Sequence, residues 1–152
     1  MDYYLSGYRV PYFGTNPGSI NIVIPEDFAL QFWVEMWKKN PNIKKLSIEI
    51  DDNYDGLKNM FTALSKCQIQ LEKLYIRNQG LNDDDGEVIA EFVKQNESLT
   101  HLNLQGNSLG TGGFKIIKAL HGKKNLIYLN LGDNNLSTRN ISSLRSIKIE
   151  TH

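Results

Sequence analysis

The fold of this chain is decided by one segment, Leu99-x-x-Leu102-x-Leu104-x-x-Asn107-x-Leu109. The same pattern returns from Leu126 to Leu136, and two earlier copies begin near residues 71 and 43. The copy near 43 is degenerate and keeps only the first three apolar positions. Four copies in phase predict a repeat architecture in which each unit packs on its neighbours.

The second half of each unit carries apolar residues at helical spacing. Three such segments lie in phase: Leu57-x-x-Met60-Phe61-x-x-Leu64, Gly86-x-x-Ile89-Ala90-x-x-Val93 and Gly113-x-x-Ile116-Ile117-x-x-Leu120. Alternating apolar residues followed by a period of 3.6 predict one strand and one amphipathic helix per unit. The pattern resembles the leucine-rich repeat, in its ribonuclease-inhibitor-like subclass, over roughly residues 43–149. The resemblance implies an α/β solenoid with parallel strands on the concave face and helices on the convex face.

We expect a single domain over residues 1–152, with four leucine-rich repeats in 43–152 that start near 43, 71, 99 and 126. Residues 1–42 depart from the repeat and are predicted to form an N-terminal cap, because the first unit of a solenoid has no upstream neighbour. The cap is expected to hold a strand at 20–24, a helix at about 26–39 and an aromatic arm. The alternative is that this arm is a docking site of its own: Tyr3, Tyr4, Tyr8, Tyr12 and Phe13.

The end of the chain supports two interpretations. Aligning it with the preceding repeat places Ile141, Leu144 and Ile147 on the apolar face of a helix, which favours a helix over residues 138–149. The alternative is a last strand, Leu144-x-x-Ile147-x-Ile149, which would begin too soon after Leu126 for a normal turn and helix to intervene. Either the chain is a fragment of a longer repeat protein, or this last element shields the core alone.

Composition limits the classes of function. The chain has 17 basic and 17 acidic residues, so no overall field attracts nucleic acid or an anionic membrane surface. The sequence shows neither a long apolar run nor a Sec-type leader, and no membrane association is predicted. Cys67 is the only cysteine, which is typical of a reducing compartment. We therefore expect a cytoplasmic protein, or one delivered into a host cytoplasm if it is a bacterial effector.

The candidate binding residues are the strand residues that point away from the core, because successive strand side chains alternate between the two faces of a sheet. We predict partner contacts at Lys45, Lys73, Tyr75, Arg77, His101, Asn103, Gln105, Tyr128 and Asn130. Tyr75, Arg77 and Tyr128 are the expected anchors, since tyrosine and arginine often dominate the energy of protein interfaces. This wall offers about 400 Å², roughly half of the ~800 Å² that each partner buries in a standard interface.

Acidic and asparagine residues outside the strands have structural interpretations. The run Asp83–Asp85 precedes a predicted helix, where carboxylates cap free N–H groups and complement the helix dipole. Thr111 is expected to act likewise before the next helix, and no metal site is predicted. The resemblance implies that Asn107 and Asn134 form a ladder of hydrogen bonds to the backbone of neighbouring turns. Gln79 holds the same position one repeat earlier and departs from that pattern.

The sequence carries no motif for catalysis. The three histidines are scattered, and no phosphate loop, Gly-x-Ser-x-Gly or His-Glu-x-x-His segment occurs, so we predict no enzyme activity and no cofactor. The resemblance implies a protein-interaction scaffold that binds a protein or peptide on its concave face, as an inhibitor, an adaptor or a bacterial effector. The alternative is a structural module that self-associates through its aromatic N-terminus or open C-terminal end. A monomer is expected in preference to a homo-oligomer.

Overall fold

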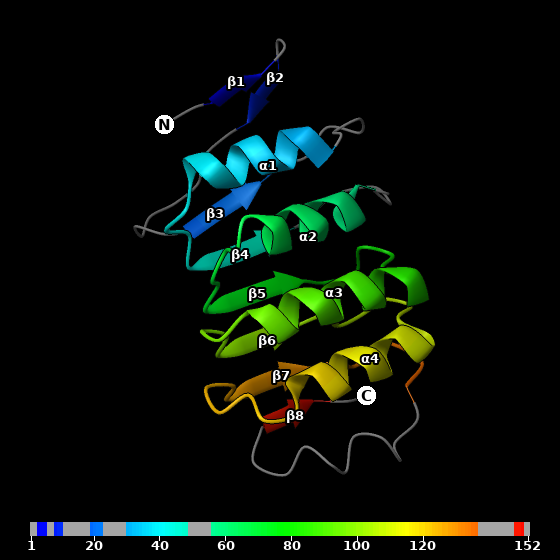
Figure 1. The fold of residues 1–152 in the computed structure, drawn as a ribbon. Coiled ribbons are helices and arrows are strands. Elements are labelled where there is room, and N and C mark those ends of the chain that lie inside the picture. The colour runs from blue at the N-terminus through cyan, green and yellow to red at the C-terminus, as the bar shows by residue number, and fades with distance from the viewer. Residues whose placement is uncertain are drawn as a thin grey trace.

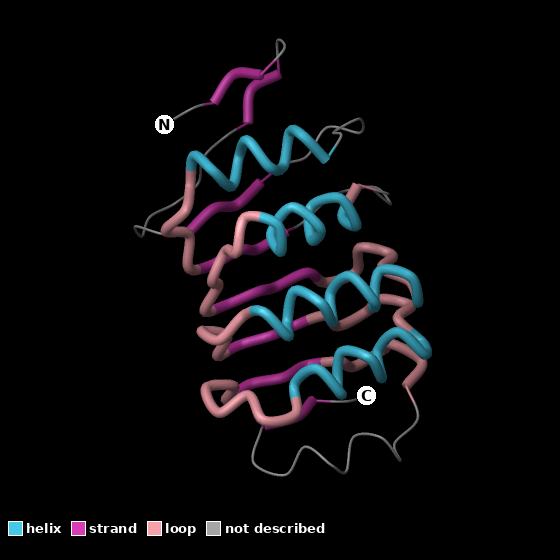
Figure 2. The backbone as a smooth tube through the Cα atoms, viewed as in Figure 1, coloured by secondary structure: helices cyan, strands magenta, loops and turns pink. Residues whose placement is uncertain are grey.

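The computed structural model describes residues 3–5, 8–10, 19–22, 30–48, 56–136 and 148–150, with side chains described for 30–48 and 56–136. Six strands form one parallel sheet in chain order: β3 (Ser19–Ile22), β4 (Lys45–Ile48), β5 (Lys73–Ile76), β6 (His101–Asn103), β7 (Tyr128–Asn130) and β8 (Lys148–Glu150). The described helices lie on one face of it (Figures 1 and 2): α1 (Leu30–Lys39), α2 (Leu57–Lys66), α3 (Asp83–Gln95) and α4 (Gly110–Leu120). A separate antiparallel hairpin pairs β1 (Tyr3–Leu5) with β2 (Tyr8–Val10).

Equivalent residues of successive repeats pair across the sheet. Leu46 lies beside Leu74, which lies beside Leu102, which lies beside Leu129, and all four are buried. This register follows from the nearly constant length of the repeats, because a repeat that stays in step keeps its leucines on the same face of the sheet. The predicted α/β solenoid of parallel strands and covering helices is confirmed.

The core lies between these leucines and the inner faces of the helices. The apolar helix positions predicted from the 3.6-residue period are buried: Leu57, Met60, Phe61, Leu64, Ile89, Ala90, Val93, Ile116, Ile117 and Leu120. Phe61 of α2 and Phe92 of α3 bring their ring centroids to 5.9 Å, which joins two repeats. In α1, Trp33 and Trp37 are fully buried and stack at 5.7 Å, so large aromatic side chains form the buried side of this helix.

Asn107 links two consecutive turns through its buried side chain. Its Oδ1 accepts hydrogen bonds from the backbone N–H groups of Gln79 at 2.9 Å and Leu81 at 3.2 Å. Its Nδ2 donates to the carbonyl oxygens of Ile76 at 2.9 Å and Leu104 at 2.7 Å. One amide thus satisfies backbone groups that the turns themselves leave unpaired in the interior.

Asn134 makes the corresponding contacts one repeat later. Its Nδ2 donates to the carbonyl oxygens of Leu104 at 2.8 Å and Leu131 at 3.1 Å, and its Oδ1 accepts from the N–H of Leu109 at 3.4 Å. Gln79 occupies the equivalent earlier position, is buried, and donates from Nε2 to two carbonyl oxygens of its own turn at 2.9 and 3.1 Å. Asn107 and Asn134 thus connect successive turns through equivalent hydrogen bonds.

Helices α3 and α4 approach each other closely at a pair of glycines. A Cβ atom built on Gly86 would lie 2.5 Å from the Cα atom of Gly112, and one built on Gly112 would collide with the backbone of Asp83. Alanine is the better helix former, so packing rather than helix propensity requires glycine here.

The start of α3 differs in detail from the expectation. The helix begins at Asp83, so the three aspartates form its first turn instead of preceding it. Asn82 is the N-cap, and its Oδ1 accepts from the N–H groups of Asp84 at 2.9 Å and Asp85 at 3.2 Å. Oδ2 of Asp85 accepts in return from the N–H of Asn82 at 2.9 Å. This capping box leaves the carboxylates at the positive end of the helix dipole.

Thr111 does not cap α4, which corrects the sequence interpretation. It lies inside the helix, whose N-cap is Leu109 with no capping side-chain hydrogen bond. Its Oγ1 donates instead to Oδ2 of Asp83 at 2.6 Å. The hydroxyl therefore ties the first turn of α4 to the first turn of α3 in the preceding repeat.

The last described element, β8, is a strand where a helix was favoured. β8 pairs with β7 in parallel and places Ile149 beside Leu129, so the predicted helix over 138–149 is wrong at its end, while 137–147 lies outside the described residues. The alternative strand was out of register, because it assigned Ile147 to the position that Ile149 takes. Pairing with β7 satisfies backbone groups at that edge of the sheet. These hydrogen bonds depend on a segment distant in sequence, so the local pattern of apolar residues does not predict them.

The N-terminal expectations are met only in part. β3 starts one residue before the predicted strand at 20–24 and is described to Ile22, and α1 is described from Leu30 within the predicted range of about 26–39. Residues 23–29 lie outside the described residues. Part of the aromatic arm forms the β1–β2 hairpin, and its remainder at 11–18 is not described.

The glycine contact predicts a loss of stability. Gly86→Ala is expected to lower the free energy of unfolding by about 1–3 kcal/mol, the usual cost of overpacking, because the new methyl group meets backbone that cannot move aside. Urea unfolding followed by circular dichroism measures this. Gly113→Ala is the matched control in α4, since its methyl group would meet only the end of the Leu136 side chain. An equal loss in the control would contradict the packing argument.

The ladder predicts a second difference in stability. Asn107→Ala is expected to lower the free energy of unfolding by about 3 kcal/mol, because it removes several buried hydrogen bonds and leaves backbone groups without partners. Asn82→Ala removes only an exposed helix cap and should cost about 1 kcal/mol. Chemical denaturation of the two variants side by side tests the ranking, which fails if the cap variant loses as much.

Candidate functional site

The sheet face opposite the helices carries the predicted contact residues. Burial alternates along β4 and β5, so the residues between the buried leucines and isoleucines point away from the core. We call this surface the strand face, and its described residues are Lys45, Ser47, Lys73, Tyr75, Arg77, His101, Asn103, Gln105, Tyr128, Asn130 and Gly132. Figure 2 shows the described helices gathered on the other side of the strands.

Strand pairing arranges this face in two rows that cross the sheet. The first row runs Lys45, Lys73, His101 and Tyr128, and the register adds position 148 of β8. The second row runs Ser47, Tyr75, Asn103 and Asn130, and the register adds position 150. Arg77 directly follows β5 and Gln105 lies two residues after the end of β6, so seven of the nine predicted contact residues occupy the two rows and two lie just beyond them.

Aromatic rings hold several side chains of the face in place. Nζ of Lys45 lies 5.5 Å from the ring centroid of Tyr75, within range of a cation–π contact. The rings of His101 and Tyr128 lie 5.8 Å apart at an interplanar angle of 30°. Tyr75, His101 and Tyr128 are each half-buried. Part of each ring therefore packs against the protein, and the other part is accessible to a partner.

The tautomer of His101 follows from its neighbour. Oγ1 of Thr100 donates to the carbonyl oxygen of Glu72 at 2.8 Å and also lies 2.8 Å from Nδ1 of His101. A hydroxyl group has one proton, so an Oγ1 that donates to Glu72 can only accept from Nδ1. This arrangement favours the tautomer with the proton on Nδ1, in which Nε2 is the nitrogen that would take up another.

Two groups of the face have shifted pKa values. Burial lowers the pKa of His101 below its usual 6.5, and the positive charge of Lys73 lowers it further. Burial raises the pKa of Tyr75 above its usual 10.0, and Tyr128 adds to that rise. Near neutral pH both groups are uncharged, so the positive charge of the described face resides on Lys45, Lys73 and Arg77.

Asn103 and Asn130 lie in the second row but are largely removed from solvent, with 8% and 3% of their surface exposed. Oδ1 of Asn103 accepts from the N–H of Gln105 at 3.1 Å, and Oδ1 of Asn130 accepts from the N–H of Gly132 at 2.9 Å. Both amides thus stabilise the turn that follows their strand. A partner can reach little of either side chain, which leaves the other seven predicted residues as the accessible part of the face.

Sequence reasoning missed Asp133 at the edge of the face. Its Oδ2 accepts from Nε2 of Gln105 at 3.2 Å, which fixes the direction of that glutamine. Asp133 has φ of 55°, and its counterparts Asn78 and Gly106 have φ of 54° and 73°. The residue before each ladder position must therefore adopt the left-handed conformation, which aspartate, asparagine and glycine tolerate best. That residue pattern was visible in the sequence.

The described residues contain no cluster of histidine, cysteine, aspartate or glutamate side chains that could hold a metal ion. The three aspartates that start α3 are instead part of the capped helix. Within the same described part of the chain, no helix has the length and apolar character needed to cross a membrane.

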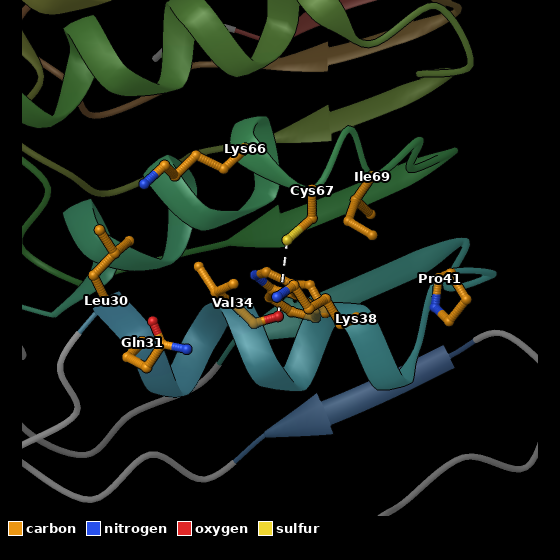
Figure 3. A pocket seen from close by; sticks show the side chains of 9 residues that line it. Leu30, Gln31, Val34, Lys38, Pro41, Lys66, Cys67 and Ile69 are labelled. Carbon is orange, nitrogen blue, oxygen red and sulfur yellow. Dashed lines mark hydrogen bonds between the residues drawn. The ribbon is translucent and has the colours of Figure 1, made fainter.

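A groove of about 670 Å³ lies between α1 and α2, away from the strand face (Figure 3). Leu30, Val34 and Ile69 give it an apolar lining, and Lys66 lies at its side. Cys67 is the C-cap of α2, and its thiol contacts the carbonyl oxygen of Val34 at 3.8 Å. The thiol is thus a structural contact between neighbouring repeats.

The pKa shift of His101 leads to a titration experiment. Its NMR titration midpoint is expected below 6.5, and Lys73→Gln should raise it without restoring 6.5, because burial is the larger cause. Lys118→Gln, an exposed change on α4, should leave it unchanged. The unfolded chain takes up this proton first as pH falls, so the associated stability is present above pH 6.5 and declines from there through the folded-state pKa. A midpoint at or above 6.5 would refute the account.

Comparison with known proteins supports the repeat assignment. The family model described as "Leucine Rich Repeat" matches residues 98–120 and 125–147. A Caenorhabditis elegans protein named "Protein phosphatase 1 regulatory subunit 37 homolog" is 26% identical over 132 residues, which cover 82% of this chain and 14% of that protein.

Two mammalian relatives belong to one named group. The human "NACHT, LRR and PYD domains-containing protein 5" is 33% identical over 79 residues, covering 51% of this chain and 7% of that protein. The mouse "NACHT, LRR and PYD domains-containing protein 1a" is 33% identical over 98 residues, covering 63% and 8%. The chain thus spans only a small part of each relative. Its matched segments are leucine-rich repeats, and with the parallel sheet and its covering helices the chain is an α/β leucine-rich-repeat solenoid.

Proposed function

We propose that this chain is a non-catalytic interaction module that binds a protein or peptide partner on its strand face. One observation carries the proposal: a face left uncovered by the described helices presents ordered aromatic and cationic side chains in two rows. The leucine-rich repeats of the chain and of its relatives support an interaction role.

Tyr75, Arg77 and Tyr128 are proposed as the anchors of this interface. Tyrosine combines a large apolar ring with a polar tip, and arginine offers several donors in a fixed geometry. The rings of Tyr75 and Tyr128 already contact Lys45 and His101, so less side-chain entropy is lost when a partner binds. Binding energy is therefore expected to concentrate on these side chains.

The size of the face sets the kind of partner. Six strands about 4.8 Å apart, with a few outward residues each, offer about 400 Å², which is roughly half of one side of a standard interface. We therefore propose a peptide segment or a weak protein partner for this chain by itself. The relatives are much longer than the matched region, and neighbouring repeats in a longer protein would extend the same surface.

The narrower roles are proposals that rest on the similarity of this chain to other proteins. The repeat period and the strand-plus-helix unit support the ribonuclease-inhibitor-like subclass. The printed name of the Caenorhabditis elegans relative describes a regulatory subunit, and regulation by occlusion or by adaptor action fits a module without catalytic groups. The free thiol of Cys67 supports a cytoplasmic location, in the cell that makes the protein or in a host that receives it as an effector.

Self-association is the second candidate. It is favoured by the position of β8, which is the last strand of the described sheet and pairs with β7 on one side. A parallel sheet edge is a ready site for pairing with another chain.

A pull-down from a lysate of the source cell tests the proposal. The triple variant Tyr75→Ala/Arg77→Glu/Tyr128→Ala is expected to lose partners that the original chain recovers, because it removes the proposed anchors. The control Lys58→Glu/Lys118→Ala alters exposed positions of α2 and α4 and should keep them. All three proteins must first show the same melting temperature. If the triple variant recovers the same proteins in the same amounts, the strand face is not the binding surface.

A further inference from the structure

The charges of the strand face are unevenly distributed. The chain as a whole has equal numbers of basic and acidic residues. In contrast, the charged residues at the described positions of this face are Lys45, Lys73 and Arg77, all cationic. The register also brings position 148, a lysine, into the first row and position 150, a glutamate, into the second, and Asp133 adds a carboxylate at the edge of the face. A locally positive row therefore crosses a molecule without net charge.

The first row places like charges side by side. Lys45 and Lys73 are register partners on neighbouring strands, which lie about 4.8 Å apart. Like charges at directly opposed positions destabilise a sheet. The ion pairs between described residues involve other lysines: Lys38, Lys44, Lys94, Lys115 and Lys123. Among the described contacts, the repulsion between Lys45 and Lys73 is thus not relieved by a carboxylate.

The pKa of His101 responds to the positive charge of the same row. Its neighbours are Lys73 on β5, Tyr128 on β7 and Thr100 on its own segment. None of these supplies a negative charge near neutral pH, and Lys73 disfavours the charged imidazole. His101 therefore stays neutral near neutral pH in the free protein, and a bound anion would favour its protonated form.

We propose that the first row binds an acidic peptide segment, rich in aspartate or glutamate, that crosses the strands from β4 towards β8. The inference rests on the proposed function and narrows its partner class. Carboxylates placed between Lys45 and Lys73 would replace their repulsion with attraction. The four strand spacings from β4 to β8 cover about 19 Å, the length of about six extended residues.

A protein segment fits this row better than a nucleic acid. Binding to nucleic acid draws its affinity from many phosphate contacts, and proteins that use it have an overall basic character. The described face has one short row of cations with tyrosines beside it, on a chain whose formal charge is zero. Tyr75 and Tyr128 in turn offer phenol groups that can donate to peptide carbonyl oxygens.

Fluorescence anisotropy tests the proposal with a defined probe. The probe is a labelled ten-residue peptide in which glutamate alternates with glycine, compared with the same peptide carrying glutamine. The glutamate peptide is expected to bind, and Lys45→Gln/Lys73→Gln should weaken it by about fivefold or more, since each cation contributes a charge-assisted contact. The control Lys58→Gln/Lys118→Gln makes the same charge change on the helix side and should leave the affinity within about twofold.

The pH dependence provides a second readout. A carboxylate beside His101 would raise the pKa of its ring, so binding takes up a proton and the affinity should increase as pH falls from about 8 to about 6. His101→Gln should abolish this increase. Lys45→Gln/Lys73→Gln removes a repulsion together with the contact of Lys45 with Tyr75, so the melting temperature should change little, and equal melting temperatures separate lost binding from lost folding.

Several outcomes overturn the inference. These are equal binding of the glutamine peptide, equal weakening by the control variant, no binding of the glutamate peptide, or tighter binding of a single-stranded RNA of equal length. A natural partner that depends on Tyr75 and Tyr128 but not on Lys45 and Lys73 would also overturn it, while the proposed function would stand. If none of these changes affects the binding of a natural partner, the proposed function itself is wrong.

Discussion

The packing of each repeat against the next is the interaction on which the rest of the structure depends. Leu74 and Leu102 are fully buried in a core to which the strands on both sides contribute leucines in the same register. A single strand and helix could not bury this surface, so the stability of the solenoid resides in interfaces between repeats. The same register that aligns the leucines inward also aligns Lys45, Lys73 and His101 outward, and the candidate site is a consequence of core packing.

Much of the fold could be predicted because the same pattern of apolar positions recurs in each repeat. Apolar positions such as Leu102, Ile89 and Ile116 recur at two periods, and together these periods specify a strand, a helix and the faces that they bury. The rows of the strand face follow from the same spacing without further assumption. The sequence was therefore informative wherever a side chain has one role in every repeat.

The remaining features depend on contacts between segments. Asn103 and Asn130 have the alternation of outward residues, but hydrogen bonds to the following turn draw them below the surface. Thr111 resembles a cap in sequence, yet the position of Asp83 in the preceding repeat recruits its hydroxyl group. A last strand was the less favoured interpretation, and its register is set by pairing with β7. In each case a tertiary partner outweighs the local pattern, and that partner cannot be read from the segment alone.

The close approach of Gly86 and Gly112 also affects the shape of the opposite side of the molecule. Neighbouring parallel strands are about 4.8 Å apart, whereas packed helices usually lie about 8–10 Å apart, and this difference makes the sheet of such a solenoid curve inward. Helices that meet through glycine sit nearer to one another, so the bend between their two repeats is reduced. The surface over β5 and β6, the strands of these two repeats, is therefore expected to bend less, which gives a rigid ligand more room to lie against it than a steeply curved arc would.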